Sequence, residues 1–388
     1  MRGKLLYLDH AASTPLRPGA LRVLEASMRE DFANPASAHQ LGRDLLQRIE
    51  SCREKFLEFL GAGKGDKLVF TGSATEANNT ITRGIGLRAG DSVIISFADH
   101  PSVTAPMEIL AKRGVKVIEL PLHMDGTPDE PALLKLLDKA VRLLILTHVN
   151  NQSGTITDFC RLSNEVKAVI PHTHIHVDAA QGFGKIPFSL KDGQIDSLCI
   201  SSHKIGGPKG IAGLYLRGGV QLSPLLYGGG QEEGLRSSTQ AAPLILSFYE
   251  AAADAMNTID FSLEGLTALN QLARDWLEER ISMVQFPFVK HSSPYILTLI
   301  LPGVSSDIIL RHLEQEGIMI SSRAACSSRI KGVDPVLTAL HLPIDEHKFV
   351  LRVSFSHETT CMDIMRFCET LKAIYDDLKV YVSRGGRG

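Results

Sequence analysis

The sequence has no large excess of charge of one sign and no long hydrophobic run. Its 388 residues include 41 Lys and Arg and 43 Asp and Glu, which gives a formal net charge of −2. A chain so close to neutrality offers no electrostatic case for binding nucleic acid or an anionic membrane surface. No run approaches the roughly 18 apolar residues of a membrane span. We therefore expect a protein that binds neither nucleic acid directly nor a membrane.

Cysteines are few and have no metal-type spacing. They stand at positions 52, 160, 199, 326, 361 and 368. Only about four apolar residues precede Asp9, too few for the core of a signal peptide. In a chain of this size without an export signal, reduced thiols are expected. The sequence thus predicts a cytoplasmic protein with no structural metal site.

What is present is an ordinary globular mixture, with 44% hydrophobic and 22% charged residues. From about residue 68 to 216, short apolar runs alternate with amphipathic, helix-like segments such as 131–141. This alternation favours an α/β domain with a mostly parallel sheet of seven strands. The strand-like runs are KLVFT, SVIIS, VKVIEL, RLLILTHV, HIHVDA, SLCISS and GLYLR.

A change of pattern near residue 260 predicts a second domain. Long helical stretches occupy about 241–256 and 263–281, and strand-like runs follow at YILTLILP, IMISSR and FVLRVSFS. We expect a large domain over 13–259. Residues 1–12 and 260–388 then form a smaller α+β domain.

Polar residues follow five of the predicted strands at the point where each strand ends. Because ligands bind outside the carboxyl ends of parallel strands, these residues should converge on one site. They are Thr71 to Thr75, Asp99-His100, Asn150-Asn151, Asp178 to Gln181, and Ser201 to Lys204.

Asp178 and Lys204 together indicate pyridoxal phosphate (PLP). A lysine amine can form a Schiff base with the cofactor aldehyde, and burial should lower its pKa. A carboxylate can keep the pyridine nitrogen protonated, so that the ring stores electrons. Lys209 is the competing lysine, further from the strand end. Asp178 could instead cap a helix, as could His100.

Neighbouring groups fit the same cofactor. Gln181 could donate to the phenolic oxygen, and His100 could stack on the pyridine face. The segment FTGSATEANNT joins a strand to a helix start, where free N–H groups and the helix dipole favour a phosphate. Glycines after Lys204 let the backbone approach a cofactor.

Two further residues suggest the substrate and the reaction. Arg352 stands inside the apolar run FVLRVSFS, where a guanidinium needs an anionic partner. That partner is either a structural carboxylate or the α-carboxylate of an amino acid. Cys326 lies among small residues near Arg323, Arg329 and Lys331, whose charge favours the thiolate. The other five cysteines fit a role as buried small hydrophobic residues.

With these residues considered, the chain resembles the cysteine desulfurases, the NifS/IscS-like branch of fold-type I PLP enzymes in the class V aminotransferase superfamily. The likeness covers nearly the whole length. The motifs that carry it are YLDHAASTP, NPASAHQLGR, FTGSATEANN, HVNNQSGTI, HVDAAQ, SSHKIGGPKG, GGGQEEGLRSSTQ, SSRAACSS and LRVSFS.

The resemblance implies a role for each matching residue. Lys204 would bind PLP covalently, Asp178 would pair with its ring nitrogen, His100 would stack on the ring, and Gln181 would contact the ring oxygen. The phosphate would be bound by Ala74, Thr75, Ser201 and His203, and by Thr239 from the neighbouring subunit of a homodimer. Asn151 and Arg352 would hold the carboxylate of L-cysteine.

The implied reaction is the conversion of L-cysteine to L-alanine. Cys326 would attack the substrate's sulfur and keep it as a persulfide. An acceptor protein would then take it, in iron–sulfur cluster assembly or tRNA thiolation. A selenocysteine lyase or another class V aminotransferase-like enzyme is the alternative, although an aminotransferase needs no thiol at position 326.

Several positions depart from the family pattern. His10 replaces an asparagine, Gln152 a glutamate and Ser238 a glycine. Gly72-Ser73 reverses the common order, and Arg323 is bulkier than the family's usual residue. None of these positions is Asp178 or Lys204.

Overall fold

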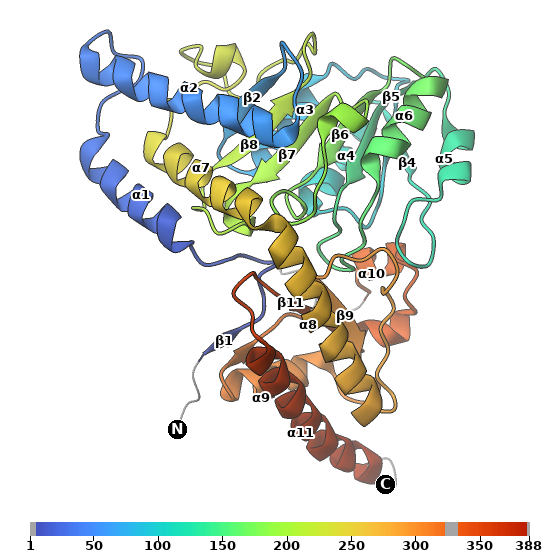
Figure 1. Cartoon of the computed structure of the whole chain (residues 1–388). Coiled ribbons are helices and arrows are strands. Elements are labelled where there is room, and N and C mark those ends of the chain that lie inside the picture. The colour runs from blue at the N-terminus through green and yellow to red at the C-terminus, as the bar shows by residue number, and fades with distance from the viewer. Residues whose placement is uncertain (1–4, 323–332, 386–388) are drawn as a thin grey trace.

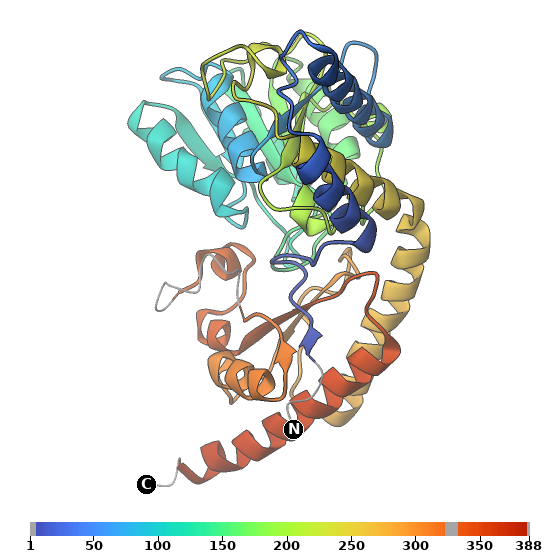
Figure 2. The same ribbon diagram turned by 90° about the vertical axis from the view of Figure 1, so that its left-hand side faces the viewer.

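The computed structural model describes residues 5–322 and 333–385, with side chains described up to residue 379. Two lobes are visible, joined by the long helix α8 (Ile259–Arg280) (Figures 1 and 2). The upper lobe holds the large sheet, and the lower lobe holds the last third of the chain together with the N-terminal strand β1 (Leu6–Tyr7).

The large sheet has seven strands in the order β2-β8-β7-β6-β5-β3-β4. β8 pairs antiparallel with both neighbours, and the remaining strands run parallel to one another. The predicted mostly parallel, seven-stranded α/β sheet is confirmed. The strands are β2 (Lys67–Thr71), β3 (Ser92–Ile95), β4 (Lys116–Glu119), β5 (Val141–Thr147), β6 (His174–Asp178), β7 (Ser197–Ser201) and β8 (Ala212–Leu216).

Both faces of this sheet are covered, because alternate residues of each strand enter different clusters. Leu68 and Phe70 of β2 pack in one core cluster with Phe56 and Phe248, while Val69 packs in another with Ile81. Strands that are buried on both faces have sequences that are continuous apolar runs. The flanking helices are α1 (Pro18–Glu30), α2 (Gln40–Leu60), α3 (Ala74–Gly84), α4 (Pro101–Lys112), α5 (Glu130–Leu136), α6 (Phe159–Val169) and α7 (Ala242–Asn257).

The lower lobe has its own hydrophobic cluster. It contains Leu297 of β9, Leu351 of β11 and, from the start of the chain, Leu6 and Leu8. β9 pairs antiparallel with β11, and β1 pairs parallel with β10. The limits of the predicted domains, 13–259 against 1–12 with 260–388, stay a prediction. The elements are β9 (Ile296–Ile300), α9 (Ser306–Gln315), β10 (Ile318–Met319), α10 (Pro335–Ala339), β11 (Val350–Ser354) and α11 (Cys361–Gly385).

The predicted helix over 131–141 is too long. Helix α5 ends at Leu136, because Leu137 is extended (ψ 118°) and Asp138 begins a turn that closes with Val141 N donating to Asp138 O at 3.1 Å. Val141 is fully buried and already belongs to β5, so pairing within the sheet overrides local helix propensity there.

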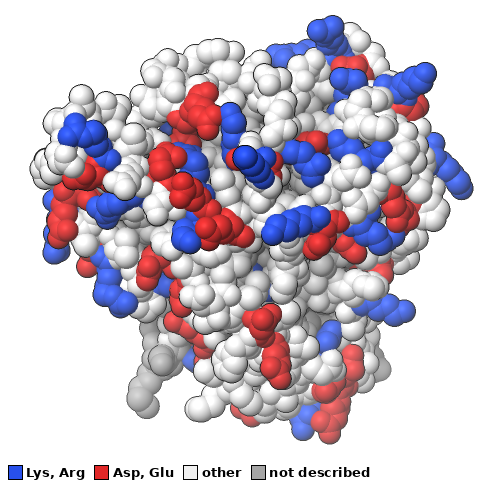
Figure 3. Space-filling model, turned by 45° about the horizontal axis from the view of Figure 1, so that its top comes forward, with Lys and Arg blue, Asp and Glu red and all other residues white. Residues whose placement is uncertain are grey.

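The described surface carries both signs of charge. Figure 3 shows Lys and Arg side chains interspersed with Asp and Glu on one face of the molecule. Among the described residues, no helix combines the length and apolar character that a membrane span requires.

Candidate active site

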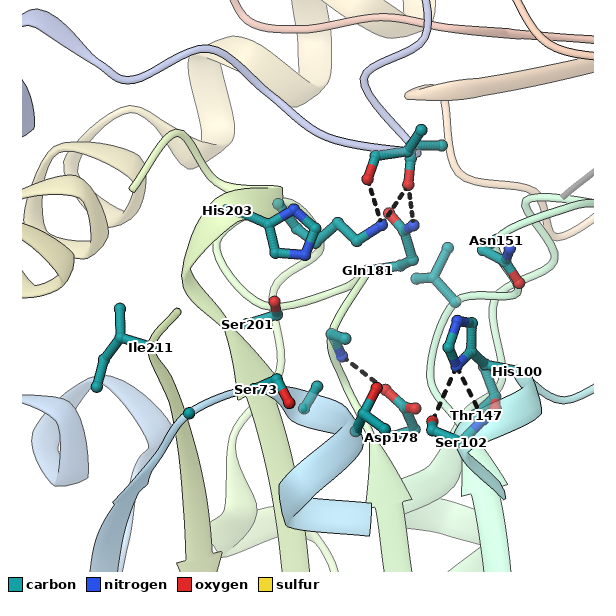
Figure 4. A pocket seen from close by; sticks show the side chains of 18 of the residues that line it. Ser73, His100, Ser102, Thr147, Asn151, Asp178, Gln181, Ser201, His203 and Ile211 are labelled. Atoms are coloured by element: carbon teal, nitrogen blue, oxygen red, sulfur yellow. Dashed lines mark hydrogen bonds between the residues drawn. The ribbon is translucent and has the colours of Figure 1, made fainter. Parts of the chain in front are cut away.

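A cavity of about 370 Å³ lies where the parallel strands end. Its walls include Ser73, His100, Asn151, Asp178 and Ser201, each from the end of a different strand (Figure 4). The predicted convergence of five strand ends is therefore confirmed. Ala11 and Ala12 of the N-terminal segment and Arg352 of β11 also line the cavity, so the lower lobe completes it.

Lys204 ends a short 3-10 turn that directly follows β7. Its half-buried amine donates to the carbonyl oxygens of Ala11 at 2.5 Å and Ala12 at 3.0 Å. These contacts hold the amine in the cavity between the two lobes. Lys209 is exposed and does not line this cavity. Of the two lysines, Lys204 is therefore the one placed to meet a cofactor.

Asp178 is the last residue of β6 and is only 7% exposed. Its Oδ1 accepts the backbone N–H of Ala180 at 3.0 Å, and its Oδ2 accepts Nδ2 of Asn78 at 2.8 Å. No helix follows it, so Asp178 is not a helix cap. The carboxylate is instead held at the floor of the cavity (Figure 4).

His100 is a helix cap, one of the two roles considered for it, and its stacking on the cofactor ring stays a prediction. It is the N-cap of α4, where its Nδ1 accepts from Ser102 N at 3.1 Å and lies 2.8 Å from Ser102 Oγ. It also lines the cavity beside Asp178. Burial lowers the pKa of His100, while Asp178 opposes and Lys204 adds to that effect. A neutral imidazole is the form that suits stacking on an aromatic ring.

Gln181 and His203 lie on the side of the cavity opposite Asp178 (Figure 4). Gln181 Nε2 donates to Ala11 O at 2.7 Å, and Lys185 Nζ approaches Gln181 Oε1 at 3.5 Å. His203 Nδ1 lies 3.3 Å from Ser13 Oγ, and burial lowers its pKa to about 4. Both side chains thus line the cavity in defined orientations.

A phosphate-sized group would meet the start of α3. Ser73 is its N-cap and accepts Glu76 N at 3.1 Å. The next two residues, Ala74 and Thr75, line the cavity together with Ser201. Free N–H groups at a helix start and nearby hydroxyls favour an anion. The predicted phosphate-binding segment therefore faces the same cavity as Lys204.

Arg352 is 1% exposed and has a protein carboxylate as its partner. Its Nη2 donates to Asp9 Oδ1 at 2.8 Å and its Nη1 donates to Asn151 O at 2.9 Å, whereas Nε has no partner among the described residues. The structural ion pair is therefore present, yet the guanidinium still lines the cavity with Asn151. Both sequence interpretations of Arg352 fit this arrangement.

Two predicted site residues need separate comment. Thr239 is exposed and does not line the cavity of its own chain. Cys326 lies outside the described residues, as do Arg323, Arg329 and Lys331. The other cysteines are free, and Cys361 is exposed rather than buried because it begins α11 at the surface.

Sequence reasoning missed three residues that organise the site. Asp9 holds Arg352, Asn78 holds Asp178, and Lys185 approaches Gln181. Asn78 could have been suspected from its position four residues after Ala74, which places both on one face of α3. The other two depend on contacts between distant segments.

The groups around the cavity fit pyridoxal phosphate. The donor set has an amine for the aldehyde, an anion for the ring nitrogen, and hydroxyls with a helix start for the phosphate. Lys204, Asp178 and Thr75 would hold these three parts of the cofactor.

Comparison with known proteins supports this assignment. The class-V aminotransferase family model matches residues 6–367. The cysteine desulfurase IscS of Dictyoglomus turgidum is 34% identical over 378 residues, covering 96% of this chain and 95% of the relative. The solved structure of a NifS-like protein superposes with a TM-score of 0.90 at 29% identity, covering 97% of this chain and all of the other. SspA in complex with cysteine has a TM-score of 0.79 at 28% identity, covering 91% and 99%.

The fold and the cavity agree with these matches along nearly the whole chain. The lysine, the aspartate and the helix start meet in one cavity of a class-V aminotransferase fold. The chain therefore belongs to the NifS/IscS-like cysteine desulfurases, pyridoxal phosphate-dependent enzymes of the class-V aminotransferase family.

Proposed function

We propose that this enzyme converts L-cysteine to L-alanine and receives the substrate's sulfur on Cys326 as a persulfide. The observation that carries the proposal is the meeting of Lys204, Asp178 and the buried Arg352 around one cavity. The similarity to a structure solved with cysteine, and to relatives named cysteine desulfurase, supports L-cysteine as the substrate.

The chain's own residues divide the work. Bound pyridoxal phosphate supplies an electron sink for charge that develops at the substrate's α-carbon. Lys204 binds the cofactor and, once the substrate replaces it, accepts the α-proton on Nζ. Asp178 holds the proton on the ring nitrogen, and His100 covers the ring. Gln181 donates to the ring oxygen.

The anionic groups of cofactor and substrate are held by separate sets of residues. Ala74, Thr75, Ser201 and His203 bind the phosphate, as hydroxyls and N–H groups at a helix start favour a dianion. Asn151 and Arg352 bind the substrate carboxylate, for which a planar guanidinium is suited. Asp9 keeps the guanidinium oriented toward the cavity.

Cys326 completes the reaction in this proposal. Its role rests on the SSRAACSS motif, since the residue lies outside the described part of the chain. The Cys326 thiolate attacks the sulfur of the substrate, an S–S bond forms and the Cβ–S bond breaks. The electron pair of that bond stays with the carbon fragment, whose Cβ takes up a proton to become the alanine methyl group, and the sulfur stays on Cys326. A sulfur-acceptor protein then takes it, for iron–sulfur cluster assembly or tRNA thiolation.

We also propose a homodimer in which Thr239 binds the phosphate in the neighbouring subunit's site. Thr239 is exposed and does not line its own chain's cavity, which is what a contribution across subunits requires. Large exposed hydrophobic residues between positions 21 and 41, and one at position 227, favour burial against a second subunit. They are Leu21, Met28, Phe32, Leu41 and Tyr227.

A cytoplasmic location is part of the same proposal. The five described cysteines carry free thiols. Oxidising compartments favour disulfides, whereas a persulfide-forming cysteine needs a reducing one. Thiol titration of the protein purified without reductant should find unpaired cysteines, whereas disulfides in that material would argue against this location.

Turnover of L-cysteine tests the proposed activity. The purified holoenzyme should form alanine and, with a thiol reductant, sulfide in equal amounts. Lys204→Ala should lose the visible absorbance of lysine-bound cofactor, and Cys326→Ser should lose sulfur release. Cys361→Ser, which alters another exposed cysteine, is the matched control and should keep it. Full sulfide release by Cys326→Ser would overturn the persulfide step.

The same assay separates the related reactions. Much faster release of selenium from L-selenocysteine, independent of Cys326, would identify a selenocysteine lyase instead. Amino-group transfer to a 2-oxo acid without sulfur release would identify an aminotransferase.

Mixing two inactive variants tests the role of Thr239. In a heterodimer of Lys204→Ala and Thr239→Ala chains, one site has both native residues only if Thr239 acts across the interface. Recovered activity on mixing would support the proposal. Unchanged inactivity of verified heterodimers would overturn it.

A further inference from the structure

Asn78 is a completely buried amide beneath the cavity, and all four of its hydrogen-bonding positions are used. Its Nδ2 donates to Asp178 Oδ2 and to Ser102 Oγ, each at 2.8 Å. Its Oδ1 accepts from His176 Nε2 at 2.9 Å and from Cys199 Sγ at 3.1 Å. A buried amide satisfied in this way has one orientation, because rotating it would oppose donor to donor.

Asp178 accepts hydrogen bonds on both carboxyl oxygens and so sets the direction of a longer chain of hydrogen bonds. A carboxylate only accepts, so the NH₂ of Asn78 must face it and Oδ1 must face His176. His176 therefore carries its proton on Nε2, and its Nδ1 accepts from Ser197 Oγ at 2.8 Å. Ser197 in turn accepts from His174 Nε2 at 2.7 Å. Each donor from His174 to Asn78 points toward Asp178.

His174 and His176 must be neutral for the hydrogen bonds to run in this direction. Burial lowers the pKa of His176 to about 3 and that of His174 to about 4. Both are therefore neutral at physiological pH, with one donor and one acceptor nitrogen each. Hydrogen bonds that share one direction polarise one another in a low-dielectric interior.

A second branch leaves the same amide. Ser102 Oγ accepts from Asn78, so its own proton is directed to His100 Nδ1 at 2.8 Å. That bond leaves the His100 proton on Nε2. Asn78 thus connects Asp178, expected to pair with the ring nitrogen, with His100, expected to stack on the ring.

We propose that Asn78 and His176 are positioning residues that hold the Asp178 carboxyl group aimed at the cofactor's ring nitrogen. The inference rests on the role proposed above for Asp178. Without these donors the carboxyl group could turn away from the ring nitrogen, and its electrostatic effect on the ring proton would weaken with distance.

Other titratable groups also face Asp178. Asp99 interacts with it electrostatically, His100 lies beside it, and the Cys199 thiol interacts both with it and with Asn78. Lys204, across the cavity, carries charge of the opposite sign when protonated. The test therefore reads the protonation of the cofactor nitrogen directly and does not rely on a pH profile of turnover.

The experiment is ¹⁵N NMR of the holoenzyme reconstituted with pyridoxal phosphate labelled at the ring nitrogen. The wild-type nitrogen should remain protonated across the accessible pH range. Asn78→Leu and His176→Phe should lower the pH of its deprotonation by about one unit or more, the size expected for losing a hydrogen bond to a charged group. Cofactor affinity, measured by titrating each apoprotein, should fall with it.

Three further variants make the result decisive. Asn164→Leu, which replaces an exposed amide on α6 that bonds Asp192 O, is the matched control and should keep the wild-type signal. The double variant Asn78→Leu/His176→Phe should shift no further than Asn78→Leu, because His176 acts through Asn78. Asp178→Asn should lose the protonated signal.

The outcomes are distinguishable. If Asp178→Asn loses the protonated signal while folded Asn78→Leu and His176→Phe proteins retain it, the positioning role is overturned and Asp178 keeps its role. If Asp178→Asn retains the signal, the role of Asp178 itself fails. Thermal unfolding of each apoprotein shows whether the variants are folded.

Discussion

Arg352 Nη2 lies 2.8 Å from Oδ1 of Asp9, a residue 343 positions earlier in the chain. The arginine is 1% exposed, whereas the aspartate side chain is 20% exposed at the edge of the cavity. Because Nη2 of the guanidinium is held by this carboxylate, the orientation of the whole planar group is fixed. This pair joins the N-terminal segment to β11 and orients the group proposed to bind the substrate carboxylate.

Replacing Asp9 by Asn should therefore impair substrate binding more than chemistry. We expect KM for L-cysteine to rise by about tenfold to a hundredfold, as for a lost hydrogen bond to a charged group, with a smaller change in kcat. Stability should fall by about 3 kcal/mol, because a buried charge loses its partner.

Steady-state kinetics and chemical denaturation measure these two effects. Arg48→Gln is the control, since the Arg48–Asp31 pair is largely exposed on its arginine side and its loss should change stability by less than about 1 kcal/mol. An unchanged KM in a folded Asp9→Asn enzyme would contradict the orienting role.

Gly182 should not tolerate a side chain. A Cβ at this position would overlap with the ring of His148, which is 2% exposed on the neighbouring strand end. We expect Gly182→Ala to destabilise the apoprotein by about 1–3 kcal/mol, as overpacking does, and to weaken cofactor binding by displacing Gln181. In a His148→Ala background the same substitution should have little effect on urea stability, and a full effect there would exclude this clash.

Lys185 should make the stability of the fold increase with pH in the alkaline range. It is 7% exposed and forms no ion pair with a described residue, and burial, aided by Lys204 and Arg17, lowers its pKa from 10.5 to about 7. Between pH 7 and 10.5 the unfolded chain binds a proton that the folded protein does not, so stability rises with pH in this window. Lys185→Met should remove that rise and stabilise the apoprotein at pH 7 by about 3–5 kcal/mol.

Urea denaturation of the apoprotein at several pH values measures this effect. Lys191→Met, at an exposed position, is the control and should keep the wild-type slope. An identical slope in Lys185→Met and the wild type would show that Lys185 is charged in the folded protein.

Asp99 should make the stability of the fold decrease with rising pH, in a lower pH range than that of Lys185. Burial raises its pKa to about 7, although Thr147 Oγ1 and Ser96 N donate to its carboxyl and oppose that effect. Between about pH 4 and 7 the folded protein holds a proton that the unfolded chain has lost, so stability falls as pH rises. Asp99→Asn should remove this fall and be more stable than wild type at pH 8, by as much as about 4 kcal/mol.

Calorimetry of the apoprotein at pH 5 and pH 8 compares the two proteins. Equal unfolding temperatures for wild type and Asp99→Asn at pH 8 would mean that Asp99 has an ordinary pKa in the fold.

The sequence alone was enough to predict the seven-stranded sheet and the meeting of its strand ends. Apolar runs buried on both faces, separated by helical segments, are local patterns, and parallel strands then bring Ser73, Asn151 and Asp178 to one edge by geometry. The end of α5 could not be read in this way, because pairing of Val141 within the sheet decided it.

Local sequence also identified Lys204 and Asp178 by their chemistry, but not the residues that support them. Tertiary structure alone showed that Asp9 holds Arg352, that Asn78 connects Asp178 with His176, and that Lys185 is buried near Lys204. A hydrogen bond or the free-energy cost of burial depends on atoms from segments that can be hundreds of positions apart in the sequence. Residue type and local spacing do not predict which of these segments come into contact. The sequence by itself determined the sheet and the chemistry of Lys204 and Asp178, and only the folded chain decided how these groups are oriented and which residues support them.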